Sequence, residues 1–137
     1  MPKPTTPPLI SIKETCLYVN DLAETYRFYH ERLGLPCLSY VEERHVFFRA
    51  GASVLLCFLP ESTREETHLP PHYGAGQLHF AFSCAPADYQ AWKDFVEKTG
   101  IAIEHEETWP GGYKSFYFRD PDQHCVEIVM EGMWRHA

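Results

Sequence analysis

The alternation of hydrophobic and polar residues in the first half of the chain predicts one helix among four strands. Residues 10–19 alternate as a half-buried strand does, and the segment after them has apolar residues at helical spacing. The apolar stripe of that helix would consist of Leu22, Tyr26, Tyr29 and Leu33. Asn20 or Asp21 is a suitable cap for its start, and Gly34 for its end. Three further strands are expected at Cys37–Val41, His45–Ala50 and Ser53–Leu59.

The second half of the chain repeats this order of elements. A strand is expected at Gln77–Cys84, followed by a helix from about Asp88 to Thr99. The residues of that helix predicted to face inward are Trp92, Phe95 and Val96. Three strands follow near Ile101–Glu106, Tyr113–Arg119 and Cys125–Met130. Because 14–21 parallels 79–88, Glu14 and His79 occupy equivalent positions in two βαβββ units, which together make an α+β fold.

The repeat divides the chain into a tail and one domain. Residues 1–9 contain four prolines and predict a loose tail, and residues 10–137 are expected to form a single domain. Its two units would span 10–60 and 76–131, joined by the polar loop 60–77. That loop is either a plain linker or a lid over a site. Its histidines, His68 and His72, are expected at the surface, with a lid role as the alternative.

Alternation within the strands also predicts which side chains share a face. Glu14, Cys16 and Tyr18 should point one way from the first strand, and His79, Ala81 and Ser83 one way from the fifth. In the last strand, Glu127 should oppose the buried pair of Val126 and Ile128. Each of these ionisable residues alone is more often solvated or structural than functional. Their related positions predict that Glu14, His79 and Glu127 meet at one concave surface.

Two carboxylates and one imidazole form a plausible set of ligands for a divalent cation. The three groups and the cation would be neutral overall, which removes the main cost of placing acidic groups together. Coordination positions would remain open for water or substrate. Cys16 shares the face of Glu14, but no adjacent basic residue lowers its pKa, so a small buried filler is the expected role.

The charge of the chain favours small molecules over nucleic acids or membranes as its partners. The chain of 137 residues has a formal net charge of -7 and no cluster of Lys or Arg, which disfavours a nucleic-acid groove or an anionic membrane surface. It has no apolar run near the roughly 20 residues that span a bilayer, and no signal-like N-terminus. Five cysteines without Cys-x-x-Cys spacing are typical of reduced thiols, so a cytoplasmic protein is expected.

Three segments give the chain a resemblance to a known family. They are ETCLYVNDLAETYRFYHERLGL, GQLHFAFSCAPADYQAWKDFVEKTGI and SFYFRDPDQHCVEIV. Over residues 10–131 the chain resembles the vicinal oxygen chelate superfamily, also called the glyoxalase/bleomycin resistance protein/dioxygenase family. The most specific part is the turn Asp120–Asp122 followed by Glu127, and the helix start at 21–29 is the second. The neighbouring His124 is expected to stabilise that turn.

The resemblance implies an open cup of mixed sheets with helices outside, a divalent metal and a homodimer, sometimes with exchanged units. It makes His79 and Glu127 metal ligands. At Glu14 the family usually has His, and in some glyoxalases Gln. A carboxylate can also bind a metal, but this departure disfavours iron-dependent ring cleavage, which normally uses two imidazoles and one carboxylate.

The pattern is most similar to the branch of fosfomycin-resistance enzymes. The fourth ligand of glyoxalase I would fall near Leu55 or Leu56, so a three-ligand site is expected. The segment KSFYFRDPDQH is close to the fosfomycin branch. Cys16, however, replaces its threonine, and its basic residues for phosphonate have no clear match. Fosfomycin itself is therefore not the expected substrate.

The hypothesis from the sequence is a metal-dependent enzyme acting on a small oxygen-bearing substrate. A divalent ion, Mn, Fe, Ni, Zn or Mg, would chelate adjacent oxygens and stabilise an enolate or alkoxide, as in lyase, isomerase, addition or dioxygenase-related chemistry. Glu14 and Glu127 are the catalytic candidates, with Glu14 either ligand or base. Candidates for the substrate pocket are Cys16, Tyr18, Ala81, Ser115 and Tyr117. The alternative is a metal-free binding or sequestration protein of the bleomycin-resistance type.

Overall fold

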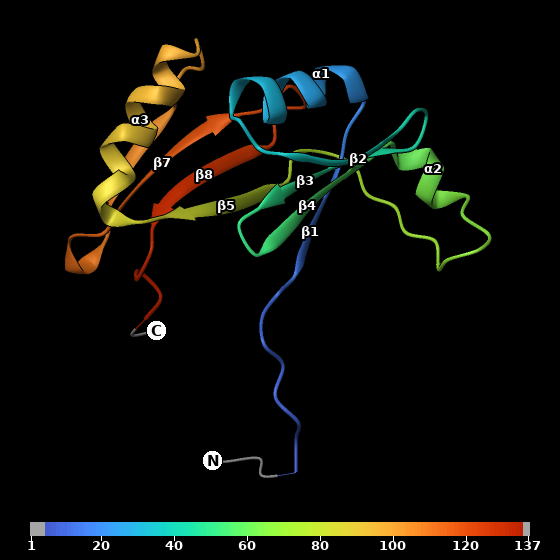
Figure 1. Cartoon of the computed structure of the whole chain (residues 1–137), viewed down its shortest axis with the longest axis horizontal. Helices are drawn as coiled ribbons and strands as arrows, with labels where there is room; N and C mark the ends of the chain where they lie inside the picture. Colours follow the sequence, from blue (N-terminus) through green and yellow to red (C-terminus); the bar gives the residue numbers. More distant parts are fainter. Residues whose placement is uncertain (1–4, 136–137) are drawn as a thin grey trace.

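The computed structural model describes residues 5–135 and contains two four-stranded mixed sheets (Figure 1). The first sheet has the order β1-β4-β3-β2, and its strands are β1 (Glu14–Tyr18), β2 (Cys37–Val41), β3 (His45–Ala50) and β4 (Ser53–Phe58). The second has the matching order β5-β8-β7-β6, with β5 (His79–Cys84), β6 (His105–Thr108), β7 (Lys114–Arg119) and β8 (Cys125–Met130). In each sheet the first strand pairs parallel with the last, and the other pairs are antiparallel. The predicted α+β class is confirmed.

The first predicted helix forms, but it changes its winding halfway along. The helix α1 (Leu22–Tyr26) continues as a π-helical segment, Arg27–Arg32, in which the Leu33 amide donates to the Phe28 carbonyl five residues earlier. Asp21 caps the start through the Glu24 amide. Phe28 lies in this segment and is buried. The buried apolar residues of this segment are therefore Leu22, Phe28, Tyr29 and Leu33, and the predicted Tyr26 is only half-buried.

The second half differs from its prediction in two places. The helix α3 (Tyr89–Lys98) buries Tyr89 and Val96, but the side chain of Phe95, predicted to face inward, is 41% exposed. Phe95 precedes Val96 by one residue and so lies about 100° around the helix from it. The strand expected near 101–106 starts later, as β6, because residues 101–104 approach β7 as irregular chain. The remaining helices are the short α2 (Pro60–Arg64) and 3-10 turns at Pro86–Asp88 and Pro110–Gly112.

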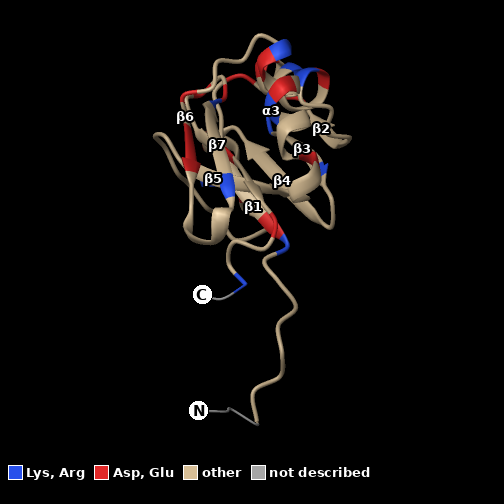
Figure 2. Cartoon of the chain, turned by 90° about the vertical axis from the view of Figure 1, so that its left-hand side faces the viewer, with Lys and Arg blue, Asp and Glu red and all other residues tan. Residues whose placement is uncertain are grey.

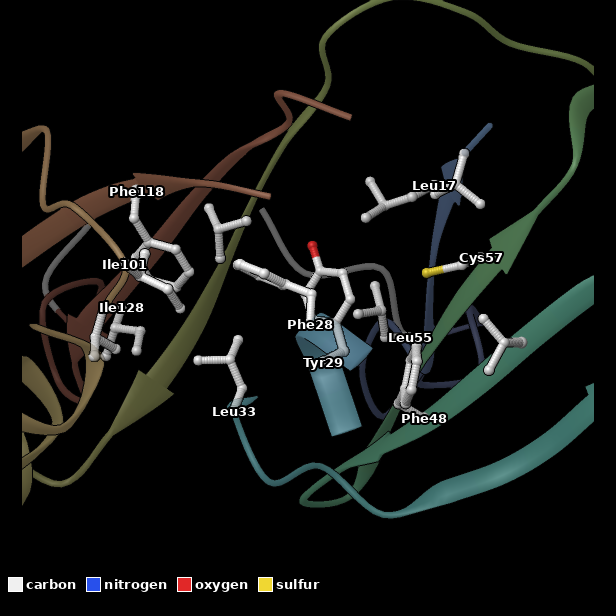
Figure 3. Packing of buried hydrophobic residues seen from close by; sticks show 14 of the residues in the cluster. Leu17, Phe28, Tyr29, Leu33, Phe48, Leu55, Cys57, Ile101, Phe118 and Ile128 are labelled. Atoms are coloured by element: carbon white, nitrogen blue, oxygen red, sulfur yellow. The ribbon is translucent and has the colours of Figure 1, made fainter. Parts of the chain in front are cut away.

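The helix α1 and its π-helical extension connect the two sheets through one hydrophobic core. Figure 3 shows Phe28, Tyr29 and Leu33 between Phe118 and Ile128 of the second sheet and Leu17, Leu55 and Cys57 of the first. All of these side chains are buried. Burial of large apolar side chains is the main favourable term in folding, so this shared core holds the two sheets together.

A turn between β7 and β8 adds a buried polar connection between the sheets. The buried carboxylate of Asp120 accepts hydrogen bonds from the Tyr29 hydroxyl at 2.7 Å and from the amides of Asp122 and His124, both at 2.9 Å. The ring of His124 accepts from the Leu78 amide through Nδ1 and donates to the Tyr18 carbonyl through Nε2. His124 thus stabilises the turn, as predicted, and also joins the end of β1 to the start of β5.

The N-terminal segment runs away from the sheets (Figure 1). Residues 1–4 of the predicted tail lie outside the described residues, and 7–13 form neither helix nor strand. The side chains of Leu9, Ile10 and Ile12 in this segment are almost fully exposed. Among the described residues, no helix is long and apolar enough to cross a membrane.

We expect Asp120→Ala to lower the free energy of unfolding by about 2–4 kcal/mol, because the buried Tyr29 hydroxyl and His124 amide and the part-buried Asp122 amide lose their acceptor. Denaturant unfolding followed by circular dichroism measures this. The matched control is Asp94→Ala, which removes an exposed carboxylate and should change stability by about 0.5 kcal/mol or less. An Asp120→Ala effect no larger than that of the control would contradict the assigned role.

Candidate metal centre and substrate pocket

His79 and Glu127 form the part of the predicted site that one chain assembles. His79 begins β5 and Glu127 lies in the adjacent β8, and the His79 Nε2 atom is 3.4 Å from Glu127 Oε1. Glu127 is only 6% exposed, whereas about half of the surface of the His79 side chain is exposed. A nearly buried carboxylate beside an accessible imidazole nitrogen is a suitable pair of ligands for a divalent cation.

The hydrogen bond on the other side of the His79 ring leaves Nε2 available. His79 Nδ1 is 2.9 Å from the carbonyl oxygen of Cys125. Because a carbonyl oxygen only accepts, Nδ1 must carry the proton, and in the neutral ring Nε2 then has a free lone pair. Histidines that bind metals in proteins are commonly oriented by such a bond. The two residues therefore fit the cation that the sequence predicts.

Tyr117 and Ala81 flank Glu127 in the register of the second sheet. Burial raises the pKa of the Tyr117 hydroxyl; a hydrogen bond with Ser115 opposes this, and the negative charge of Glu127 adds to it. Tyr117 therefore stays protonated at neutral pH. Ser115 itself is completely buried and accepts a hydrogen bond from Trp109 Nε1 at 2.9 Å. Ala81 is exposed and lines a cleft of about 490 Å³ between the two sheets.

The charged residues of β6 lie beside this site and already have protein partners. Figure 2 shows the acidic colour along β6. There Glu106 accepts hydrogen bonds from Tyr89 and Lys93, and the His105 ring contacts Glu107 at 2.8 Å. These carboxylates are occupied by protein partners, so they do not extend the pair of His79 and Glu127.

Glu14 lies on the first sheet, away from that pair. Within residues 5–135 of one chain, no three His, Cys, Asp or Glu side chains come together as a metal site. Glu14 is far from His79 because opposite ends of β1 and β5 meet. The His124 ring joins Tyr18, at the end of β1, to Leu78, the residue before the start of β5. Glu14 starts β1, four residues earlier, which at 3.3 Å per residue is about 13 Å along the strand.

Glu14, Cys16 and Tyr18 share one face of β1, as predicted, and line a pocket of about 610 Å³ on the first sheet. Leu17 and Val19, whose side chains point to the other face of β1, are in the core. Burial and the nearby Cys16 raise the pKa of Tyr18 to about 12, so its hydroxyl stays protonated and can donate to His72 Nδ1 at 2.5 Å. The central loop therefore covers part of this face through His72, whereas His68 is an exposed residue.

The same pocket contains residues that the sequence analysis did not select. The largest omission is His45, whose ring lines the pocket together with Arg44 and Phe47. The strand alternation of His45, Phe47 and Arg49 against the buried Val46 and Phe48 was visible in the sequence. It indicates a shared face for these residues, but it does not indicate that the face is hollow.

Comparison with known proteins identifies the family of this chain. The family model described as "Glyoxalase/Bleomycin resistance protein/Dioxygenase superfamily" matches residues 11–128. The chain belongs to this superfamily. It is 30% identical over 125 residues to "Glutathione transferase FosA" of Serratia marcescens, covering 88% of this chain and 80% of the relative.

Solved structures show the same fold. A lactoylglutathione lyase from Agrobacterium tumefaciens is 34% identical, with a TM-score of 0.88 and coverage of 93% of this chain and 98% of that one. A glyoxalase/bleomycin resistance protein/dioxygenase from Nocardioides, 21% identical, has a TM-score of 0.71 and coverage of 93% and 89%. The latter likeness concerns the fold alone.

We expect Gly74→Ala to loosen the central loop from β1. A Cβ atom at this position would lie 2.5 Å from the ring of Tyr18, a distance at which the ring or the loop must move. Hydrogen exchange followed by mass spectrometry should show faster exchange in the peptide covering residues 66–76. The control Ala75→Ser changes an exposed neighbour and should leave exchange as in the original protein. Equal protection in both variants would show that the loop does not depend on this contact.

Proposed function

We propose that this protein is a metal-dependent enzyme that acts on a small substrate bearing two adjacent oxygen atoms. The observation that carries the proposal is the pair of Glu127 and His79, in which the carboxylate is nearly buried and the imidazole has its Nδ1 proton fixed by Cys125. With the ring proton on Nδ1, Nε2 and the Glu127 oxygen are two acceptors only 3.4 Å apart, an arrangement that a cation between them would stabilise.

We propose that Glu14 of a second copy of the chain completes the ligand set. In one chain Glu14 faces a different pocket. The segment next to it carries Leu9, Ile10 and Ile12 with almost no contact to its own sheets, and exposed aliphatic side chains in a row are typical of a surface that another protein covers. In a dimer with twofold symmetry, each chain would give Glu14 to its partner, making two equivalent sites.

A divalent cation held there would withdraw electron density from the two substrate oxygens. The chain itself contributes orientation and proton positions. His79 and Glu127 would hold the cation on the second sheet, and the protonated hydroxyl of Tyr117 can donate to a substrate oxygen on which negative charge develops. Glu14, which is exposed in one chain, is the carboxylate that could serve as a base instead of a ligand.

The names of two relatives suggest the first substrate to test. The relatives from Serratia marcescens and Agrobacterium tumefaciens, at 30% and 34% identity, are named as a glutathione transferase and a lactoylglutathione lyase. We therefore propose that glutathione adducts, or glutathione with a second substrate, are assayed before other small molecules.

Metal uptake tests the proposal directly. We expect the purified protein to bind about one Mn²⁺ per chain, and Glu127→Gln to weaken binding by about a hundredfold or more. Isothermal titration calorimetry measures both. The control Glu131→Gln changes an exposed carboxyl after β8 and should bind as the original protein does. If Glu127→Gln binds equally well, the ligand assignment fails; if no divalent metal binds, a metal-free binding protein replaces the enzyme.

Mixed dimers test the contribution of the second copy. Glu14→Ala and His79→Ala should each abolish tight uptake in a homodimer, because each removes one ligand. A heterodimer of the two variants, obtained by co-expression with different affinity tags, should bind one Mn²⁺. This result is expected because one of its two sites would combine an intact Glu14 from one chain with intact His79 and Glu127 from the other. A heterodimer without tight sites would place all three ligands in one chain.

The association state itself is a separate expectation. The exposed Leu9, Ile10 and Ile12 should be covered in a dimer, so light scattering should give about twice the chain mass of 15.9 kDa. Ile10→Glu combined with Ile12→Glu should shift the protein toward the monomer at micromolar concentration, because the charges would be buried without partners. A monomer in the original protein would contradict the shared site.

A further inference from the structure

The pocket beside Glu14 has walls that are mostly flat and apolar. It occupies the face of the first sheet that points away from the core, and its volume is about 610 Å³. The floor comes from β1, β3 and β4, and Leu69 and His72 of the central loop form an outer wall. The side chains that supply ring faces or edges to it are Tyr18, His45, Phe47, Phe58 and His72.

His45 in this pocket has a nitrogen without a partner. The residue is 8% exposed, and its ring stacks on Phe47 with a centroid distance of 3.8 Å and an angle of 10°. Its Nε2 atom lies 2.9 Å from the Ser39 hydroxyl. Among the side-chain nitrogens and oxygens of residues 5–135, His45 Nδ1 is the buried atom that lacks a hydrogen-bond partner. Buried polar atoms are almost always hydrogen-bonded, so such an exception calls for a ligand or a water.

The charges around His45 are compensated. The guanidinium of Arg44 makes an ion pair of 2.8 Å with Glu66 and lies 5.9 Å from the centroid of the Phe58 ring. Burial and the charge of Arg44 both lower the pKa of His45, so its ring is neutral at pH 7. The side chains around His45 are therefore neutral or aromatic, and the nearby cation, Arg44, is already paired with Glu66 and is not free for an anionic group.

We propose that this pocket binds a flat, uncharged, aromatic or conjugated part of the substrate, and that the His45 ring turns toward it on binding, so that Nδ1, which has almost no accessible surface in this structure, hydrogen-bonds a polar atom on it. This inference rests on the proposed function in one respect: the pocket ends at Glu14, so a group held there would continue from a substrate bound at the metal centre. The hydrogen bond would give the buried nitrogen of His45 the partner that it lacks, and the aromatic ring faces would favour a planar group over a saturated one.

The test uses three small probes and does not require the metal. Phenol is flat and neutral, cyclohexanol carries the same hydroxyl on a saturated ring, and benzoate is flat but charged. Protein labelled with ¹⁵N at histidine is titrated with each probe in the presence of a chelator. The ring signals of His45 are assigned by their loss in His45→Phe, which keeps a flat ring on Phe47 but removes Nδ1. His68→Phe, at an exposed histidine, is the control.

The expected result is a saturable shift of the His45 ring nitrogens with phenol, and binding of cyclohexanol and benzoate that is weaker by about tenfold or more. His45→Phe should weaken phenol binding by about tenfold, and His68→Phe should leave it unchanged. Unchanged His45 signals with phenol, or equal phenol affinity in His45→Phe, overturns the proposal. Preference for benzoate overturns it as well. If His45→Phe does not fold, the labelled original protein still tests the proposal through the shift with phenol and the order of the probe affinities. The His45 signals are then assigned with Ser39→Ala, which removes the hydrogen-bond partner of Nε2.

These outcomes are separable from those of the proposed function. Phenol binding at His45 with no metal uptake would reject the metal-dependent enzyme and keep the pocket. Metal uptake that depends on Glu127, with no phenol binding at His45, would do the reverse.

Discussion

The buried hydrogen bonds of Asp120 and His124 fix how the two sheets lie relative to each other. Asp120 holds the Tyr29 hydroxyl, and the His124 ring joins the carbonyl of Tyr18 to the amide of Leu78. The edge strands β1 and β5 are thereby tied to one turn of the chain. Unpaired buried polar groups are costly, so this arrangement has few alternatives once the surrounding core has formed.

This constraint has a direct consequence for the candidate site. The start of β5 meets the end of β1, so His79 is held near Tyr18 while Glu14 is held at the far end of its strand. Under the proposed function, Glu14 and His79 can bind the same cation only if Glu14 comes from a second copy of the chain. The exposed aliphatic segment before Glu14 is consistent with such a neighbour. The separation of Glu14 from His79 is thus a property of the fold and not of the residue types.

The sequence was sufficient for what depends on local periodicity. The alternation in β1 placed Glu14 and Cys16 on one face, and Asp21 was one of the two residues expected as the helix cap, because side-chain direction and capping follow from neighbouring residues. The π-helical turn that contains Phe28 was missed, since a five-residue hydrogen bond changes the helical period without a clear sequence signal. The late start of β6 was missed for a related reason, because Ile101 and Ile103 remain packed on the core although their backbone is not a strand.

Distances between sheets could not be predicted in the same way. Because Glu14 and His79 hold equivalent positions in the two repeats, they were predicted to meet. The repeat shows that each residue starts the first strand of its unit, but it does not show how those two strands lie relative to each other. The orphaned nitrogen of His45 also depends on three-dimensional detail, namely that Ser39 satisfies Nε2 and that nothing reaches Nδ1.

The most direct measurement of the central claim is a crystal structure of the protein grown with Mn²⁺, with the metal located by its anomalous scattering. The account predicts a peak about 2 Å from His79 Nε2 and from a Glu127 carboxylate oxygen of one chain, and at the same distance from a Glu14 oxygen of its partner. A peak bonded to other residues, or a Glu14 ligand from the same chain as His79, would contradict it.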